Sequence, residues 1–481
     1  MKTPEQGSFQ VARRRGKAAG RRVAPWTTML PRAADGPSLR LVDLDPKTAG
    51  PGRTPLLLRM IAFCTFAVPS SMVIAPIGAA GTVPLMLATG LFVLWAASSL
   101  LGLHDPVGAR HPGRVGLALL LVATSASYVG LYSGWTGPNT EAARASADRW
   151  VILLLASTAV IFVATETLRT INDVMVLVRA LLAGGMFCCL VAAVQFFLKV
   201  NPTEWIGNVM PGFTYNGGDT AFQNRGPLLR VAGTTFTPIE LAVVCSMLLP
   251  LSIWRGLYDT VGRKWIHWAG AMLLVFTIAV TVSRSGVLGL TVGMAVLIPF
   301  MPAFARSWTF VILPIVVSGL FLSIPGLIGT IFSALTPEQG DPSITTRTNN
   351  YPRVEAMFQE RPILGLGPGN YTPTNALHIL DNQYLNATVT MGIVGLLGTV
   401  AYLAIPGIAA YLAARAARAP ALKCFAASVA AGAVVGTVCS LTFDSLSFPV
   451  FALAYPLMVG LSGSAWIMTR NEKALVDKGE S

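Results

Sequence analysis

The chain is poor in charged side chains: they make up 12% of its 481 residues, whereas hydrophobic residues make up 53%. A soluble domain needs more polar surface than this, so the composition excludes a soluble enzyme and a disordered chain. Apolar runs of about 18 to 25 residues recur from Leu56 almost to the C-terminus, long enough to cross the ~30 Å hydrocarbon core of a bilayer. The short alternating segments of a porin-like barrel are missing. The sequence therefore predicts an all-α polytopic membrane protein.

Cysteine pairs and metal-ligand clusters are also missing. The six cysteines all lie inside apolar runs, and the sequence contains no CxxC motif and no Cys/His cluster. This distribution excludes a secreted disulfide scaffold and argues against a zinc site. We therefore expect the cysteines to be small buried hydrophobic residues, and we expect no metal and no cofactor.

The positive charge is concentrated before the first apolar run. The chain carries a net charge of +13, and residues 1–54 supply +7 of it, with eleven Lys and Arg against four Asp and Glu. Such a tail can bind either nucleic acid or the anionic surface of a membrane. It lacks aromatic residues interleaved with its basic ones, so we predict a disordered cytoplasmic tail that contacts membrane lipid, and no nucleic-acid partner.

The apolar runs predict about twelve transmembrane helices within residues 55–470, followed by a short cytoplasmic tail at 471–481. Basic residues offer an independent check, because cytoplasmic connections are enriched in Lys and Arg. With the basic N-terminus in the cytoplasm, every inward connection is short and basic, as with Arg110 and Arg114. Both termini are therefore predicted to be cytoplasmic. The predicted helices are residues 56–78, 82–101, 115–132, 149–167, 174–198, 236–254, 265–283, 286–301, 308–334, 383–412, 422–442 and 446–468.

Two outward connections are long, near residues 199–235 and 335–382, and both are rich in Gly, Pro, Asn and Thr. Long loops in a compact chain are usually functional or disordered. A short helix is predicted around residues 352–360, before Pro362, which favours order in the second loop. The sequence shows no internal repeat, which weakens the case for a transporter built from two related halves.

Among the arginines on the predicted outer side, which run against the usual topological bias, four stand out: Arg230, Arg284, Arg347 and Arg361. Arg284 is the sharpest case, because the short segment 281–286 interrupts two apolar runs and places a guanidinium at the edge of the bilayer. Charge at this depth is costly and by default marks a site, although an arginine can also extend to lipid phosphate.

Arg230 directly precedes a short polar turn and the start of a predicted helix. A helix start presents unpaired N–H groups and the positive end of a dipole, which together suit an anion. An ordinary helix start explains Thr237 and Pro238 equally well, but it does not explain the arginine. Glu240, one turn into the same helix, is a further buried charge, and we expect it to pair with an arginine.

The second long loop combines a glycine cluster with a histidine and a carboxylate. Gly365, Gly367 and Gly369 do not form a nucleotide loop, because no strand precedes them and no Lys-Ser/Thr follows. We expect them instead to let the backbone pass close to other groups. His378 is the only histidine on the predicted outer side, and it lies three residues before Asp381.

Several arginines, a histidine and a carboxylate on the outer face limit the possible chemistry. ATP is absent there, so an activated group has to arrive already bound to lipid. Guanidinium groups suit bidentate phosphate recognition, and they stabilise the negative charge that builds on a departing lipid diphosphate. Such a reaction requires no metal.

At these positions the chain resembles the superfamily of O-antigen ligases and O-antigen (Wzy-type) polymerases, which are glycosyltransferases of the bacterial envelope. The resemblance spans about residues 150–470 and depends on four motifs that occur in order. They are Arg230 before Gly233-Thr234 and a helix containing Pro238; Ser283-Arg284-Ser285-Gly286; Arg361-Pro362-x-x-Gly365-x-Gly367-x-Gly369; and Asp381-Asn382-Gln383-Tyr384-Leu385 leading into Gly392-Ile393-Val394-Gly395-Leu396.

The resemblance implies a GT-C-like membrane glycosyltransferase that moves a glycan from an undecaprenyl-diphosphate carrier to an acceptor sugar hydroxyl. The transfer would invert the anomeric carbon, on the outer face of the bacterial cytoplasmic membrane, in surface polysaccharide or exopolysaccharide synthesis beside other export components. The diphosphate would be bound by Arg230, Arg284, Arg347 and Arg361, and Arg284 would also assist catalysis.

The last motif departs from the family at the position of the base. Many ligases of the family carry His immediately before the Asn of this motif, where this chain has Asp381. Either Asp381 or His378 could accept the hydroxyl proton, and a helical turn would put both on one face. Asn382, Gln383 and Tyr384 are predicted acceptor or motif positions. The Asp-Asn-Gln-Tyr-Leu form favours a polymerase or exopolysaccharide role over a lipopolysaccharide ligase.

Other classes of protein stay open as alternatives. A flippase or secondary transporter of a lipid-linked sugar would distribute charge through the membrane, whereas here it gathers near one face. A mannosyltransferase-type enzyme usually has acidic residues in its first outer loop, but residues 79–82 are Ala-Ala-Gly-Thr. A structural scaffold is the third alternative, since a sequence by itself does not prove turnover.

Overall fold

The computed structural model describes residues 40–478 except 107, 137–138, 217–221, 226–227, 324–341, 372, 374 and 376–377. The predicted tail at residues 1–54 is therefore described only from residue 40, and the tail at 471–481 only as far as residue 478. The second of these is helical almost to its described end, because the last helix runs to Asp477.

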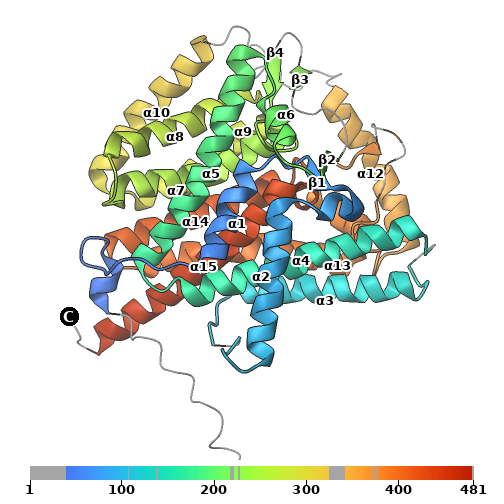
Figure 1. Ribbon diagram of the computed structural model, residues 1–481, viewed down its shortest axis with the longest axis horizontal. Coiled ribbons are helices and arrows are strands. Elements are labelled where there is room, and N and C mark those ends of the chain that lie inside the picture. Colours follow the sequence, from blue (N-terminus) through green and yellow to red (C-terminus); the bar gives the residue numbers. More distant parts are fainter. Residues whose placement is uncertain are drawn as a thin grey trace, which may run out of the picture. The chain divides into compact units, whose positions relative to one another are not determined.

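The described residues form mainly helices, with a few short strands (Figure 1). The helices are α1 (Leu56–Ala67), α2 (Val83–Leu100), α3 (Gly113–Tyr132), α4 (Glu141–Thr167), α5 (Ile171–Leu198), α6 (Pro202–Asn208), α7 (Pro238–Tyr258), α8 (Lys264–Val280), α9 (Arg284–Leu297), α10 (Ala303–Ser323), α12 (Pro342–Glu360), α13 (Gln383–Ala416), α14 (Pro420–Cys439) and α15 (Pro449–Asp477). The strands are β1 (Met72–Ile74), β2 (Phe213–Tyr215), β3 (Phe222–Arg225) and β4 (Leu228–Val231).

Within the described residues, 8 helices are long and apolar enough to cross a membrane: α2, α3, α4, α5, α7, α13, α14 and α15. Helices α1, α8 and α9 are apolar but shorter. Each predicted span overlaps one helix, and the short helix predicted at 352–360 is the second half of α12. A helix satisfies its own backbone hydrogen bonds, which a bilayer requires. The prediction of an all-α polytopic membrane protein is confirmed.

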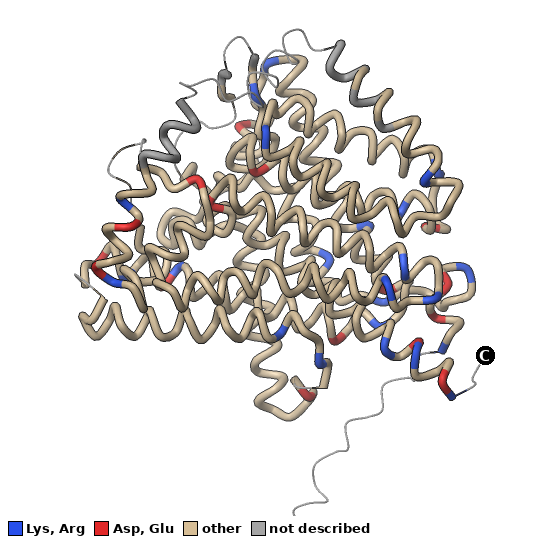
Figure 2. The backbone as a smooth tube through the Cα atoms, turned by 180° about the vertical axis from the view of Figure 1, so that it is seen from behind, with Lys and Arg blue, Asp and Glu red and all other residues tan. Residues whose placement is uncertain are grey.

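Many of the basic residues lie at one end of the bundle (Figure 2). Figure 2 shows several Lys and Arg around the end where the last helix finishes. There Arg179 binds Asp259, and the Lys264 ammonium donates to the backbone carbonyl of Asp259 at 2.8 Å. The indole N–H of Trp254, near the end of α7, donates to the carbonyl of Ala421 in α14 at 3.0 Å. The end of α7 and the start of α14 therefore meet at this end.

The first helix is shorter than the predicted 56–78, because α1 ends at Ala67. Pro69 explains the early end. Proline cannot donate a helical hydrogen bond, and it excludes the residue before it from the helical conformation. Val68 is accordingly extended, with φ −90° and ψ 132°.

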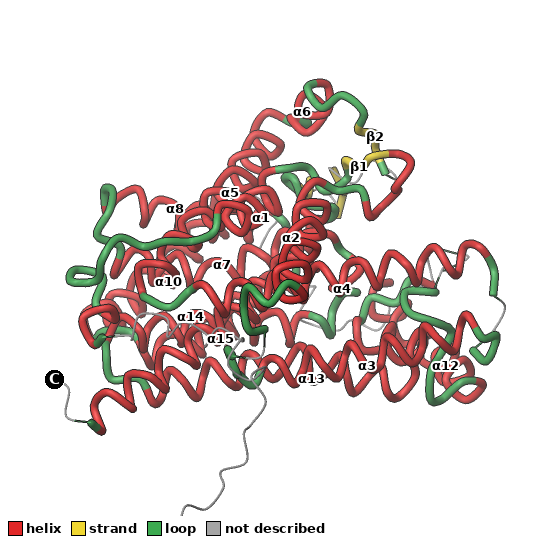
Figure 3. The backbone as a smooth tube through the Cα atoms, turned by 60° about the horizontal axis from the view of Figure 1, so that its bottom comes forward, coloured by secondary structure: helices red, strands yellow, loops and turns green. Residues whose placement is uncertain are grey.

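The chain continues from α1 into β1, which ties the first connection to the predicted long loop at 199–235. β1 pairs antiparallel with β2, and Val73 lies opposite Thr214. A second antiparallel pair joins β3 and β4, with Gln223 opposite Arg230. Figure 3 shows how short β1 and β2 are beside the surrounding helices. Part of the loop at 199–235 is therefore ordered by strand pairing and carries Arg230 on β4.

Helix α15 is buried along most of its length, and it packs against α4, α13 and α14. Every residue from Val450 to Ala465 is buried. Helix α13 packs lengthwise against α3, where small residues allow the backbones to touch. A methyl group added to Gly116 would lie 2.6 Å from the carbonyl oxygen of Ala401.

Two buried glutamates cap helices other than their own. Glu240, at the start of α7, accepts from the amides of Val450 at 2.8 Å and Phe451 at 3.0 Å, in the first turn of α15. Glu472, near the end of α15, accepts from the amide of Arg418 at 3.0 Å, just before α14. The prediction that Glu240 pairs with an arginine is wrong. The unpaired N–H groups and the positive dipole of a helix start are its partners instead.

Candidate functional site

The glycine-rich loop after α12 packs against a break in α13. The break lies at Gly392, which has φ 63° and ψ −158°. The loop fills it: the N–H of Gly367 donates to the carbonyl of Thr390 at 2.9 Å. Methyl groups added to Gly365 and Gly392 would lie 2.4 Å from the carbonyl carbon of Thr390 and 2.3 Å from the carbonyl oxygen of Ile363. The expectation that these glycines allow close backbone approach is confirmed.

The last predicted motif starts α13 and ties it to the connection between α14 and α15. Asn382 caps α13 by accepting from the amide of Tyr384 at 2.9 Å. The side-chain oxygen of Gln383 accepts from the amide of Leu446 at 2.7 Å, and the hydroxyl of Tyr384 donates to the carbonyl of Thr437 at 2.8 Å. These three motif side chains therefore hold the α14–α15 connection against the start of α13.

That connection carries Asp444, a carboxylate with an incomplete set of partners. Its Oδ2 accepts from Asn386 at 2.8 Å and from Ser447 at 2.6 Å, but its Oδ1 is buried and accepts no hydrogen bond from the described residues. Burial, and to a lesser extent the charge of Asp381, raises the pKa of Asp444 to about 7, although its hydrogen bonds and Arg149 oppose the shift. A buried oxygen without a donor is costly, so a ligand that donates to it gains free energy.

Asp444 lines a cavity of about 260 Å³. The cavity lies where the first turns of α2, α13 and α15 meet the first half of α4 and the glycine-rich loop. Segments far apart in the sequence thus build one polar pocket; we call this end of the bundle the cavity end. The other polar and aromatic side chains of its wall include Ser146, Arg149, Trp150, Tyr371, Asn386 and Ser447.

Arg149 brings a positive charge to this cavity from α4. Its guanidinium makes no hydrogen bond and no ion pair with any described residue. The neighbouring Trp150 is buried, and its indole N–H donates to Thr124 at 3.3 Å. The cavity therefore contains a guanidinium without a bonded partner and, in Asp444, a carboxylate oxygen without a donor.

A second group of charges lies at the junction of α8 and α9. The Nε of Arg230 donates to the carbonyl of Thr281 at 2.8 Å. This bond brings Arg230 beside the segment that leads into Arg284, the first residue of α9. Within that segment Val282 has φ 47°, which is strained for a β-branched residue. Such strain is concentrated at functional sites.

This junction adjoins the connection that carries Asp444. Ser285 shares a hydrogen bond of 2.7 Å with Thr442, two residues before Asp444 in sequence. The thiol of Cys439, at the end of α14, donates to the carbonyl of Ser285 at 3.4 Å. The start of α9 is thus bonded to the same short connection that lines the cavity.

Two of the predicted arginines lie elsewhere. Arg361 donates to the carbonyl of Thr136, beyond the end of α3, so its guanidinium ties the glycine-rich loop to the α3–α4 connection. The backbone of Arg347 belongs to α12, and its side chain lies outside the described residues. In the described part of the chain, none of the four predicted arginines lines the cavity.

His378 and Asp381 both precede α13 in the chain. The hydroxyl of Tyr371 donates to the backbone carbonyl of His378 at 2.6 Å. Residues 379–382 are not helical, because the Asn382 cap starts the helix only after them. The expectation that a helical turn puts both side chains on one face is wrong. Asp381 is nevertheless near enough to Asp444 for its charge to raise the pKa of that carboxyl group.

Three residues of the cavity were not predicted from the sequence: Arg149, Asn386 and Asp444. Arg149 and Asp444 are charges at the predicted outer ends of apolar runs, which is the signal that singled out Arg284. Asn386 carries no such signal, because a polar residue in the first turn of a helix is common. Only its bond to Asp444 reveals its place in the site.

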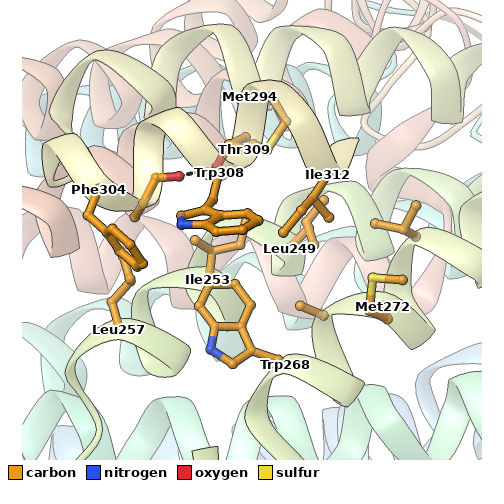
Figure 4. A pocket seen from close by; sticks show the side chains of 13 residues that line it. Leu249, Ile253, Leu257, Trp268, Met272, Met294, Phe304, Trp308, Thr309 and Ile312 are labelled. Atoms are coloured by element: carbon orange, nitrogen blue, oxygen red, sulfur yellow. Dashed lines mark hydrogen bonds between the residues drawn. The ribbon is translucent and has the colours of Figure 1, made fainter. Parts of the chain in front are cut away.

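A larger cavity, of about 380 Å³, lies between α7, α8, α9 and α10. Figure 4 shows Trp268 and Trp308 in its wall together with Met272 and Ile312. Its lining is apolar apart from Thr309 and the two indole N–H groups, and it includes no charged side chain. Size alone therefore does not identify the site, since this cavity has no group to bind a phosphate or accept a proton.

Fold and cavity together define a polytopic helical membrane protein with a polar, charged pocket at one end. Residues 269–400 match the family model described as O-antigen ligase. The match runs from α8 into α13 and includes Arg284, the glycine-rich loop and the cap of α13. This match supports the resemblance to O-antigen ligases and polymerases that the sequence motifs indicated. The search of curated proteins gives no match.

Proposed function

We propose that the protein transfers a glycan from an undecaprenyl-diphosphate carrier to a hydroxyl of an acceptor sugar. One observation carries the proposal: Arg230 lies beside the segment of Arg284, and this junction is bonded to the connection that contains Asp444. Cations suited to a leaving diphosphate thus adjoin carboxylates that can take a proton. The match to O-antigen ligases supports the same class of reaction.

In this reaction the acceptor oxygen attacks the anomeric carbon while the bond from that carbon to the diphosphate breaks. The configuration inverts, the lipid diphosphate leaves with the electron pair, and the hydroxyl proton passes to a carboxylate. Arg230 and Arg284 bind the diphosphate and stabilise the charge that builds on it. Because these cations neutralise the leaving group, the proposed reaction is metal-independent.

Asp444 joins Asp381 and His378 as a candidate for the base. Its pKa is raised to about 7, close to the value at which a general base works best near neutral pH. Asp381 is the charged neighbour that helps to raise it. Asn386 and Ser447 bind Oδ2 of Asp444, so we assign its Oδ1 to the acceptor hydroxyl.

The other predicted residues have supporting roles in this proposal. Arg361 positions the glycine-rich loop, since its guanidinium is bound to a backbone carbonyl. Arg347 is proposed as a further diphosphate ligand. Asn382, Gln383 and Tyr384 position the carboxylates by holding the start of α13 against the α14–α15 connection.

We further propose about twelve transmembrane helices, cytoplasmic termini, and a cavity end on the outer face of the bacterial cytoplasmic membrane. The basic residues around the opposite end support this orientation, because cytoplasmic connections are enriched in Lys and Arg (Figure 2). Other polysaccharide export components would then act beside the protein. A flippase would need polar groups along a path through the membrane, whereas the polar cavity described above lies at one end of the bundle.

The glycan profile of a deletion strain tests the proposal and separates its two forms. A polymerase, which the form of the last motif favours, should leave single repeat units and no polymer. A ligase should leave finished polymer on its lipid carrier. An unchanged profile, in a background where the parent strain demonstrably makes the protein, would refute glycan transfer.

A further inference from the structure

Two arginines on α4, Arg144 and Arg149, differ in whether other residues bind their guanidinium groups. Arg144 donates from its Nε to Asn139 and lies over the ring of Tyr132, 5.5 Å from its centre. Arg149, on the same helix, lines the cavity and has no hydrogen bond or ion pair with a described residue. The proposed transfer chemistry assigns the diphosphate to Arg230 and Arg284, so it leaves Arg149 without a role.

The wall around Arg149 suits a sugar. Trp150 and Tyr371 supply aromatic surface, and Ser146, Asn386 and Ser447 supply hydrogen-bonding groups. Ligand pockets combine apolar and aromatic lining with a few polar groups that fix orientation. The volume of about 260 Å³ lies below the ~300–1,000 Å³ that is usual for drug-sized ligands, so the cavity admits a single sugar unit more readily than a chain.

Arg149 and Asp444 both line the cavity, but among the described residues they form no ion pair with each other. Arg149 is exposed at the cavity. The Oδ2 of Asp444 is bonded to Asn386, and its Oδ1 lacks a donor. A ligand with an anionic group for Arg149 and a hydroxyl for Oδ1 would satisfy both residues.

We infer that this cavity binds the acceptor sugar and that Arg149 binds a carboxylate on that sugar. The inference rests on the proposed glycan transfer and adds the chemical class of the acceptor, which is an acidic saccharide such as one containing a uronic acid. A guanidinium binds a carboxylate through two parallel hydrogen bonds. The donor diphosphate offers the same anionic chemistry, so the test has to separate the two sources.

Calorimetric titration of the purified full-length protein in detergent tests the inference without turnover. The probes are a glucuronic-acid-containing tetrasaccharide, its carboxyl-reduced counterpart and inorganic pyrophosphate. The acidic saccharide should bind about tenfold or more tightly than the reduced one, the gain typical of a charge-assisted hydrogen bond. Arg149→Gln should abolish this preference, and Arg144→Gln, on the same helix, should keep it. Arg149→Lys should retain part of the preference, which guards against a misfolded Gln variant.

Three outcomes would overturn the inference: equal affinity of the wild type for both saccharides, a full preference in folded Arg149→Gln, or displacement of the acidic saccharide by pyrophosphate. The last would assign Arg149 to the donor. These outcomes are distinct from failure of the proposed function. Loss of polymer in the deletion strain, together with no preference for the acidic saccharide, would leave glycan transfer standing and reject only the acidic acceptor.

Discussion

Two carboxylates at opposite ends of the bundle show how differently the fold treats buried charge. Asp259, directly after α7, accepts a two-pronged bond from Arg179 at 2.5 and 3.0 Å, one from Arg255 at 3.1 Å and one from the amide of Val261 at 2.9 Å. Asp444 is bound only by an amide and a hydroxyl group, and its Oδ1 has no donor among the described residues. Both oxygens of Asp259 therefore have donors in the described part of the chain, whereas only one oxygen of Asp444 does.

The distance between Asp259 and Asp444 follows from the length of α7. Glu240, at the start of α7, caps α15 beside the connection of Asp444, whereas Asp259 follows the end of α7. A helix rises 1.5 Å per residue, so the two ends of α7 are roughly 30 Å apart. Asp259 and Asp444 are therefore too far apart to share hydrogen-bond partners.

The pKa values of the two groups differ for the same reason. Burial acts to raise the pKa of both. At Asp259 the hydrogen bonds from Arg179, Val261 and Arg255 outweigh burial and lower the pKa below its ordinary value. At Asp444 burial prevails and raises the pKa to about 7. The comparison indicates that a completed ion network serves stability, whereas an incomplete one leaves a group that can accept a proton.

The largest expected effect lies at the cavity end, at Arg284. Arg284→Ala should lower glycan transfer by about 10²–10³-fold, as expected for a group that stabilises leaving-group charge. Arg284→Lys keeps the charge but loses the fork, so it should be nearly as damaging. Single-turnover transfer of a lipid-linked glycan in proteoliposomes is the appropriate measurement, because product release can limit the steady state. Wild-type polymer yield from both variants at normal protein level would remove Arg284 from the mechanism.

Asp444→Asn should lower transfer by about 10²-fold and leave the unfolding temperature close to that of the wild type. The asparagine oxygen can still accept from Asn386 and Ser447, but it cannot take a proton. In the wild type, kcat/KM should rise as the pH increases through about 7, where Asp444 loses its proton.

This rise should be absent from Asp444→Asn. If the variant keeps the same pH dependence, the base is another group, and the comparison of Asp381→Asn with His378→Ala should then show one of them to be much worse than the other.

Asp259→Asn should have the converse effect, lowering stability while the folded variant keeps its transfer rate. Arg179 and Arg255 lose their partly buried counter-ion, at a cost of roughly 3 kcal/mol in the free energy of unfolding. Because the folded pKa of Asp259 is lowered, its contribution is present above the ordinary pKa and is lost as the pH falls through the folded value. The unfolding temperature of the wild type should therefore fall more steeply than that of the variant below about pH 4. Equal stability of the two proteins at neutral pH would contradict this role.

The smallest effects should come from the two glutamates that cap neighbouring helices. Glu240→Gln keeps one acceptor oxygen but turns an NH₂ group towards an amide N–H, which should cost about 1 kcal/mol of stability. Glu472→Gln is the matched control at the opposite end and should cost a similar amount. Only Glu240→Gln should also reduce transfer, slightly, because α15 starts beside Asp444. A greater loss of transfer in Glu472→Gln would reverse the assignment of the ends.

Sequence patterns predicted the features that act within one segment. The length of the apolar runs and the positions of prolines predict most helices. Pro69 shows where run length fails, because the apolar sequence continues past the end of α1 at Ala67. The glycine cluster was recognisable because glycine alone tolerates close backbone approach. Arg149 and Asn386 were missed because their roles depend on Asp444, which belongs to a different and distant part of the chain.

By itself the sequence determined that the chain crosses a membrane repeatedly as helices and where its out-of-place charges lie, because hydropathy and charge are properties of each segment. Only the tertiary structure decided which of those charged groups have hydrogen-bond partners. Glu240 accepts from helix amides, Asp259 accepts a guanidinium fork, and Asp444 keeps an open oxygen in the cavity that Arg149 lines. The physical reason is that the partners of a buried charge are the donors that packing brings within hydrogen-bond distance, and those donors come from segments far apart in the chain.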